Sequence, residues 1–202
     1  MRTRAELLEV TERLVASEGC EAVTTTRVAA ESGVAVGTIY RYFPNREALL
    51  LGAYDATVER IAIGCAKHLA DLEPTLEPQV AILSMIDCYL AAADDIPAHA
   101  PLLREMQRLR PVAEDRASDA GQITDDILLA FLRRYGLGNI NIAPGNLAVV
   151  QALLSTLVDL YLVTEEKTAR ANIHRELQAH AILAFRRLRD QSPRKAVGSM
   201  LD

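Results

Sequence analysis

The sequence predicts an all-α protein. Ala, Leu, Arg and Glu dominate its 202 residues, and all four are strong helix formers. The 10 Gly and 8 Pro are too few for a loop-rich chain of β-strands, and apolar side chains recur at steps of three and four residues. With 50% hydrophobic and 24% charged residues, the chain can bury a core, which excludes wholesale disorder.

A capping box opens the first predicted helix. Thr3-Arg4-Ala5-Glu6 has the Ser/Thr-x-x-Glu pattern, in which each side chain satisfies a backbone N–H of the first turn. Apolar residues then recur at helical spacing up to Gly19, and glycine supplies the left-handed residue that ends many helices. We therefore expect a helix over about 4–18.

Two short helices and a long one are predicted next. Thr24 caps a helix that Gly33 ends, and a second short helix is expected over 36–43. The aromatic residues of that segment could also suit a strand, but their spacing is too irregular for alternation. Asn45 then caps a long helix over about 46–71.

Prolines divide the rest of the chain into further helices. The expected segments are helices over about 78–93, 97–108 and 111–136, a loop over 136–146, helices over 146–163 and 168–190, and a frayed polar tail over 191–202.

The formal net charge of −5 is unevenly distributed. Residues 1–46 hold 6 Arg against 6 Glu, whereas the remainder holds 16 Lys and Arg against 21 Asp and Glu. The glutamates of the first segment gather in its first helix, and Arg27, Arg41 and Arg46 come later. Because local fields decide what binds, the acidic total does not exclude a nucleic-acid partner.

The cysteines and the apolar segments predict a cytoplasmic protein. Cys20, Cys65 and Cys88 lie far apart, without CxxC pairing or the even number of a secreted framework. The charged N-terminal segment lacks the apolar core of a signal peptide. The most apolar stretch, 147–163, is interrupted by four polar residues, so we expect no membrane span.

Enzyme chemistry finds little support in the sequence. The four histidines have no metal-binding spacing, and no Gly-x-Ser-x-Gly, P-loop or dinucleotide fingerprint occurs. Two pairs of adjacent aspartates, 94–95 and 125–126, would point about 100° apart on a helix. We predict no enzyme, no metal site and no cofactor.

The two short helices have the size and the glycine turn of a helix-turn-helix, whose second helix enters the major groove of DNA. Ile39 and Phe43 lie four residues apart and can anchor that helix on its neighbours. The hydroxyl-bearing and charged side chains of that helix then face outward, where they can hydrogen-bond to the phosphate oxygens of DNA. These residues are Thr38, Tyr40, Arg41 and Tyr42. Taken singly, such residues are more often caps, packing residues or solvated charges.

The segment 24–49 resembles the DNA-binding signature of TetR-family transcriptional repressors. The resemblance covers roughly 4–51 and lies in Thr24-Thr25-Thr26-Arg27, Gly33-Val34, Thr38-Ile39-Tyr40-Arg41-Tyr42-Phe43 and Arg46-Glu47-Ala48-Leu49. It implies a homodimer that binds a palindromic operator and is released by a small-molecule inducer. It also implies a helix-turn-helix domain over 1–50 and a helical ligand-binding and dimerisation domain over 51–190, with a flexible tail over 191–202.

The resemblance assigns DNA contacts position by position. It implies phosphate contacts for Thr24, Thr25, Tyr40, Tyr42 and Arg46, base-facing positions for Val36, Gly37 and Thr38, and either kind of contact for Thr26 and Arg27, with Arg41 adding charge. Arg46 stands where the family usually has Lys. Ala35 replaces the commoner Ser cap, which removes about 1 kcal/mol of helix stability and suggests ordering on DNA.

The larger part is expected to hold the inducer and to form the dimer. A small-molecule cavity is typically lined by apolar side chains with a few polar groups among them. The lining that the resemblance implies is Tyr54, Ile86, Tyr89, Leu103, Met106, Ile127 and Phe131. The same residues would also suit an ordinary core. The last two helices present apolar faces that the family pairs across a two-fold axis. The alternatives are a helical small-molecule binding protein or enzyme with a vestigial helix-turn-helix, and a purely structural dimer.

Overall fold

The computed structural model describes residues 4–111, 114–115, 118–136 and 144–190, and every regular element in these ranges is a helix. This confirms the predicted all-α class. The elements are α1 (Arg4–Glu18), the 3-10 helix η1 (Cys20–Ala22), α2 (Thr25–Ser32), α3 (Val36–Tyr40), α4 (Arg46–Asp71), α5 (Pro78–Asp94), α6 (His99–Leu109), α8 (Asp119–Arg134), α9 (Pro144–Val163) and α10 (Lys167–Asp190).

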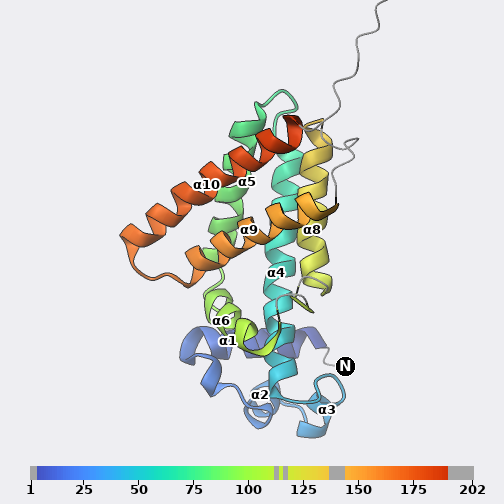
Figure 1. Cartoon of the computed structure of the whole chain (residues 1–202). Coiled ribbons are helices and arrows are strands. Elements are labelled where there is room, and N and C mark those ends of the chain that lie inside the picture. Colours follow the sequence, from blue (N-terminus) through green and yellow to red (C-terminus); the bar gives the residue numbers. More distant parts are fainter. Residues whose placement is uncertain (1–3, 112–113, 116–117, 137–143, 191–202) are drawn as a thin grey trace, which may run out of the picture.

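The helices form two groups joined by α4 (Figure 1). The first three helices lie at one end of the molecule. Helices α5 and α8 pack against the other part of α4, while α9 and α10 pack on each other and on α5. Helix α6 lies between the groups and contacts α1, η1 and α4. Because α4 runs through residue 51 without interruption, the chain has no flexible linker at this point.

The predicted caps form as expected. Thr24 Oγ1 accepts a hydrogen bond from the Arg27 N–H at 3.1 Å, and Asn45 Oδ1 accepts one from the Ala48 N–H at 2.7 Å. Gly33 ends α2 with φ 63°, the left-handed conformation that glycine adopts without strain. The predicted cap at Thr3 lies outside the described residues.

Two helices differ from the prediction in length. Helix α3 ends at Tyr40 rather than near Phe43, because the carbonyl of Ile39 accepts both the Tyr42 and the Phe43 N–H at 2.9 Å and Pro44 follows. Helix α8 begins at Asp119, well after Pro111. Its start is set by Ser118, whose hydroxyl accepts the Gly121 N–H at 3.2 Å. The expected tail, 191–202, and most of the expected loop lie outside the described residues.

Two apolar clusters form the core. The larger one joins α1 to α6 and takes Leu162 from α9 and Leu177 from α10. The smaller one lies toward the other end of α4 and joins it to α5, α8 and α10, around Phe131 and Phe185. The N-terminal helices are therefore built onto the same core as α4 and α6, which fixes their position.

Helix α9 is apolar and is covered by the rest of the chain on one side only. Within the described residues, α9 is the one helix whose length and hydropathy would allow it to cross a membrane. Its mean hydropathy is 1.7 over Gly145–Val163. Only 6% of that window is buried within the chain. Large apolar side chains are exposed along α9 at Val149, Leu153 and Leu160, and on α10 at Leu183.

Candidate nucleic-acid interface

Helix α3 is held by one face and exposed on the other. Ile39 and Phe43 are buried, as their spacing predicts, whereas Tyr40 and Tyr42 are 53% and 36% exposed. Among the other residues assigned to DNA, Thr24, Thr26, Gly37 and Arg41 are exposed and Thr25, Arg27, Val36, Thr38 and Arg46 are partly buried. The structure thus brings the hydroxyl groups of α2 and α3 to one end of the molecule.

Helices α2 and α3 are linked by their polar side chains as well as by the core. Thr25 Oγ1 lies 3.3 Å from Tyr40 Oη, so a hydroxyl at the start of α2 meets one at the end of α3. Tyr40 is exposed and Thr25 partly exposed, and both hydroxyls keep further hydrogen-bonding capacity. Such a pair can contact neighbouring phosphate oxygens while it fixes the angle between the two helices.

The first turn of α3 presents its backbone openly. Ala35 occupies the N-cap position and makes no side-chain capping bond, as predicted. A Cβ placed on Gly37 would meet no heavy atom within 4 Å. The glycine therefore leaves space on the outer side of the helix, where a DNA strand can approach the backbone closely.

Arg27 is paired with carboxylates in the free protein. Its guanidinium bonds to Glu18 and, at 3.2 Å, to Glu31, and the bond from Glu18 raises the pKa of Arg27 above its usual range. Arg13 also contacts Glu31 at 3.2 Å. Because exposed ion pairs contribute little, Arg27 could exchange these partners for a phosphate at small cost.

Arg46 makes internal contacts that the sequence did not reveal. Its Nε donates to the carbonyl of Val23 at 2.8 Å and its Nη2 to that of Cys20 at 2.7 Å. Its Nη1 lies 3.6 Å from Glu105 on α6. The planar fork of arginine can bridge two carbonyls in this way, whereas the single ammonium of lysine cannot match that geometry. Arg46 therefore connects η1, α4 and α6.

Gly52 on α4 sets how closely Phe43 can pack. A Cβ at this position would lie 2.8 Å from Phe43 Cε1 and 3.3 Å from Leu8 Cδ2. Glycine to alanine in a helix interior normally stabilises by about 0.5–1 kcal/mol. Here the clash with a buried ring reverses the sign, and we expect Gly52→Ala to lower the free energy of unfolding by about 1–3 kcal/mol.

Gly64 is a matched control on the same helix, because a Cβ there would meet nothing within 4 Å. Urea titrations of Gly52→Ala and Gly64→Ala should therefore shift in opposite directions. Equal stabilisation by both variants would show that Phe43 does not hold the end of α3 against α4.

The residues implied to bind an inducer are packed in the interior. Tyr54, Leu103, Met106 and Phe131 are buried, and Ile86, Tyr89 and Ile127 are partly buried. Phe131 belongs to the smaller core cluster and the others to the larger one. None of them lines the open groove of about 660 Å³ on α4 and α5 or the hollow of about 320 Å³ near Arg170.

One buried and one partly buried polar group lie among these residues. His99 on α6 is buried, stacks on Tyr54 with 5.7 Å between ring centroids, and its Nδ1 lies 2.8 Å from Thr57 Oγ1. Asp159 on α9 accepts a hydrogen bond from Gln107 at 3.2 Å. Burial lowers the pKa of His99 to about 4 and raises the pKa of Asp159 to about 6. In the sequence, Asp159 appeared only as a polar interruption of an apolar stretch.

Residues 7–53 match the family described as bacterial regulatory proteins, tetR family. The HTH-type transcriptional repressor KstR is 45% identical over 58 residues in Rhodococcus jostii and 41% identical over 58 residues in Mycobacterium tuberculosis. The N-terminal segment, residues 7–53, is therefore a domain of the tetR-family type. Its match spans about a quarter of these curated relatives, 27% and 26% of their lengths, and 29% of this chain.

Solved structures extend the TetR-family likeness of the fold to nearly the whole chain. A TetR variant from Acinetobacter baumannii in complex with minocycline superposes with a TM-score of 0.66 at 18% identity, covering 94% of this chain and 99% of that one. The repressor AlkX from Dietzia gives 0.65 at 15% identity, covering 94% and 96%. At such identities the likeness shows the fold alone.

Proposed function

We propose that this protein is a transcriptional repressor that binds a palindromic operator as a homodimer and is released by a small-molecule inducer. The observation that carries the proposal is the short helix α3, anchored by Ile39 and Phe43 and exposing Tyr40 and Tyr42. The N-terminal identity to proteins named as repressors supports it. Such a protein would act in the cytoplasm, where the operator DNA lies.

The proposed DNA surface comprises the exposed side of α2 and α3 together with the turn that follows α3. Thr25, Tyr40 and Tyr42 would bond to phosphates, while Gly37 and Thr38 would face base edges in the major groove. Arg27 and Arg41 would add positive charge, and Thr24, Thr26 and Val36 would complete the surface. Arg46 would act chiefly by holding α4 beneath it, through the carbonyls of Val23 and Cys20.

The proposed dimer interface is the uncovered apolar side of α9 with the adjoining face of α10. Val149, Leu153 and Leu160 follow one another at steps of four and seven residues, so they form one stripe along α9. A second copy related by a two-fold axis would cover the stripe with its own. Such a dimer would carry one helix-turn-helix in each protomer, related by the two-fold axis. The two half-sites of the operator should therefore lie about 34–36 Å apart or a multiple of that distance.

The proposed inducer site lies between α4, α5, α6 and α8, where Tyr54, Tyr89, Leu103, Met106 and Ile127 meet. Since these side chains pack against one another, an inducer would have to displace them, which would move α6 relative to α4. The polar groups of the buried His99 and the partly buried Asp159 would provide hydrogen bonds for such a ligand. In this scheme the division at residue 50 separates the DNA-reading part from the ligand-binding and dimerising part.

Selection of DNA fragments by the purified protein, followed by affinity measurements, tests the proposal. We expect Tyr42→Phe to weaken binding about 30-fold on every sequence, since one phosphate bond of about 1 kcal/mol is lost in each half-site. Thr38→Ala should instead change the preferred base at one position of each half-site. Affinity should also fall steeply as salt rises.

The rival, a small-molecule binding protein or enzyme with a vestigial helix-turn-helix, predicts no selected sequence and no salt dependence. Circular dichroism of both variants would control for folding. If Tyr42→Phe changed sequence preference and Thr38→Ala did not, the assignment of phosphate and base contacts would be wrong.

A further inference from the structure

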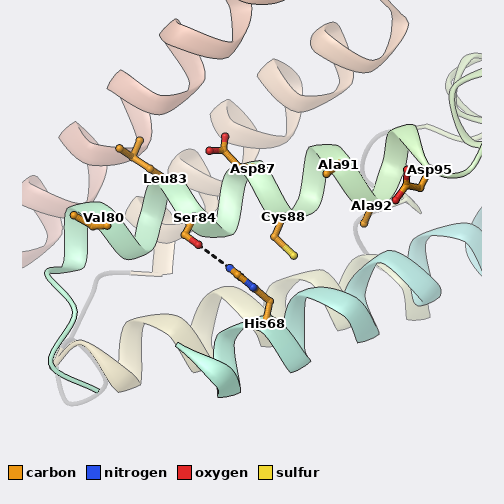
Figure 2. Close-up of a pocket in the computed structure, with 9 residues that line it drawn as sticks. All are labelled: His68, Val80, Leu83, Ser84, Asp87, Cys88, Ala91, Ala92 and Asp95. Carbon is orange, nitrogen blue, oxygen red and sulfur yellow. Dashed lines mark hydrogen bonds between the residues drawn. The ribbon is translucent and has the colours of Figure 1, made fainter. Parts of the chain in front are cut away.

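Two cysteines on neighbouring helices meet beside the groove between α4 and α5. Cys65 on α4 is buried in the core, and Cys88 on α5 is partly exposed and lines the groove. Beside burial, the neighbouring Cys88 raises the pKa of Cys65, so the two side chains lie close together. One turn away, His68 Nε2 lies 2.7 Å from Ser84 Oγ and links the same two helices (Figure 2).

The helical register supports this contact independently. Cys65 precedes His68 by three residues on α4, and Cys88 follows Ser84 by four on α5, so on antiparallel helices each pair meets one turn from the other. Figure 2 shows the Cys88 sulfur directed from α5 toward α4. The thiols therefore face each other, with one of them open to small molecules.

We propose that Cys65 and Cys88 form an oxidation site, in which a hydroperoxide entering the groove converts the two thiols into a disulfide. The apolar side chains of Val80 and Leu83 line the same groove and suit the organic part of an alkyl or aryl hydroperoxide. In a reducing cytoplasm such a disulfide would be transient, which is the usual character of regulatory disulfides there.

The two cysteines have different roles because their surroundings differ. Burial and, to a smaller extent, the neighbouring Cys88 raise the pKa of Cys65 to about 12. Cys65 therefore stays a thiol until Cys88 has been oxidised. Cys88 is the group that the groove exposes, and its thiolate makes the first attack. Thus Cys88 is oxidised first and Cys65 resolves the product.

The reaction balances without another reactant. The Cys88 thiolate attacks the outer oxygen of the hydroperoxide, an S–O bond forms, the O–O bond breaks, and the alcohol leaves after taking up the proton that Cys88 had lost. The sulfur of Cys65 then attacks the sulfenic sulfur. The S–S bond forms as the hydroxyl leaves with the Cys65 proton as water. Two thiols are oxidised by two electrons, and the hydroperoxide is reduced to alcohol and water.

A disulfide here would tie two core helices together at one point. It holds its two Cα atoms about 4.4–6.8 Å apart with a fixed dihedral angle, so it would restrict how α4 and α5 can move relative to each other. Because α4 also carries Arg46 and Gly52 beneath α3, a shift of α4 would reach the DNA-reading helices. This consequence rests on the proposed function, whereas formation of the disulfide does not.

The test treats the reduced full-length protein with stoichiometric cumene hydroperoxide and locates the modified cysteines by peptide mass after alkylation of free thiols. We expect a Cys65–Cys88 disulfide within one chain, reversed by dithiothreitol. Cys88→Ser should abolish it. Cys65→Ser and Cys65→Ala should both stop at a sulfenic acid on Cys88 that dimedone traps, and Cys20→Ser should react like the parent protein.

The inference is overturned if Cys65 and Cys88 stay reduced in the folded protein, or if the linkage forms only through Cys20 or only in urea. Operator affinity is then measured separately for the oxidised and reduced forms, and a change of tenfold or more is expected. A protein that forms the disulfide but binds no DNA in either form would contradict the proposed function and leave the oxidation site standing.

Discussion

Leu153→Arg should convert the protein from dimer to monomer and lower its operator affinity at least 100-fold. Leu153 is 42% exposed in the single chain and lies in the middle of the α9 stripe. Symmetry places two copies of the substitution in one interface, so two unpaired charges would be buried at a cost of several kcal/mol. A monomer binds only one half-site, so it lacks the increase in affinity that a dimer obtains by binding both half-sites at once.

Ile63→Arg provides the matched control, because Ile63 is 62% exposed on α4, away from this stripe. Analytical ultracentrifugation should find dimers for the parent protein and for Ile63→Arg, and monomers for Leu153→Arg with unchanged circular dichroism. A dimeric Leu153→Arg protein would place the interface elsewhere.

His99 and Asp159 should have opposite effects on stability between pH 4 and 6.5. Burial lowers the pKa of His99 from 6.5 to about 4, so in this range the unfolded chain binds a proton that the folded chain does not. Its contribution to stability is therefore lost as pH falls from 6.5 toward 4. For Asp159, burial raises the pKa from 3.8 to about 6, so the folded chain keeps a proton that the unfolded chain releases. Its contribution therefore changes in the opposite sense, and acid favours the folded state.

The two effects largely cancel in the parent protein, and single substitutions should expose them. At about 1.36 kcal/mol per pKa unit, each amounts to roughly 2–3 kcal/mol. Relative to the parent protein, His99→Asn should gain this amount of unfolding free energy as pH falls from 6.5 to 4. Asp159→Asn should lose it over pH 6 to 4.

Urea titrations at half-unit pH steps would measure both differences. Asparagine keeps a polar partner for Thr57 at position 99 and for Gln107 at position 159, so the comparison isolates the charge. If the free energy of unfolding had the same pH dependence in all three proteins, folding would not shift the pKa of either group.

Local signals in the sequence predicted most of the helices. The caps at Thr24 and Asn45 and the left-handed turn at Gly33 depend only on residues within one turn, and all three occur in the structure. The four-residue spacing of Ile39 and Phe43 likewise identified the buried side of α3. The last residues of α3 were assigned wrongly, where Pro44 turns the chain out of the helix, and so was the start of α8, which lies at Asp119.

The candidate site was predicted less completely, because partners distant in sequence decide how its side chains are used. Arg46 was assigned to phosphate by its position, but its donors bond to the carbonyls of Val23 and Cys20. Arg27, also assigned to DNA, is held by Glu18 and Glu31 in the free protein. A basic residue in a motif indicates charge, and it does not indicate which acceptors already surround it.

The amino-acid sequence alone predicted the helical class, the order and most of the ends of the helices, and the resemblance of the N-terminal segment to the TetR family. These properties follow from backbone capping, glycine conformation and apolar spacing, which act over a few residues. Tertiary packing was needed to show that His99 is buried and Asp159 partly buried, that Cys65 lies next to Cys88, and that one apolar side of α9 stays uncovered. Burial and contact depend on how helices far apart in the chain pack, and local spacing carries no information about that packing.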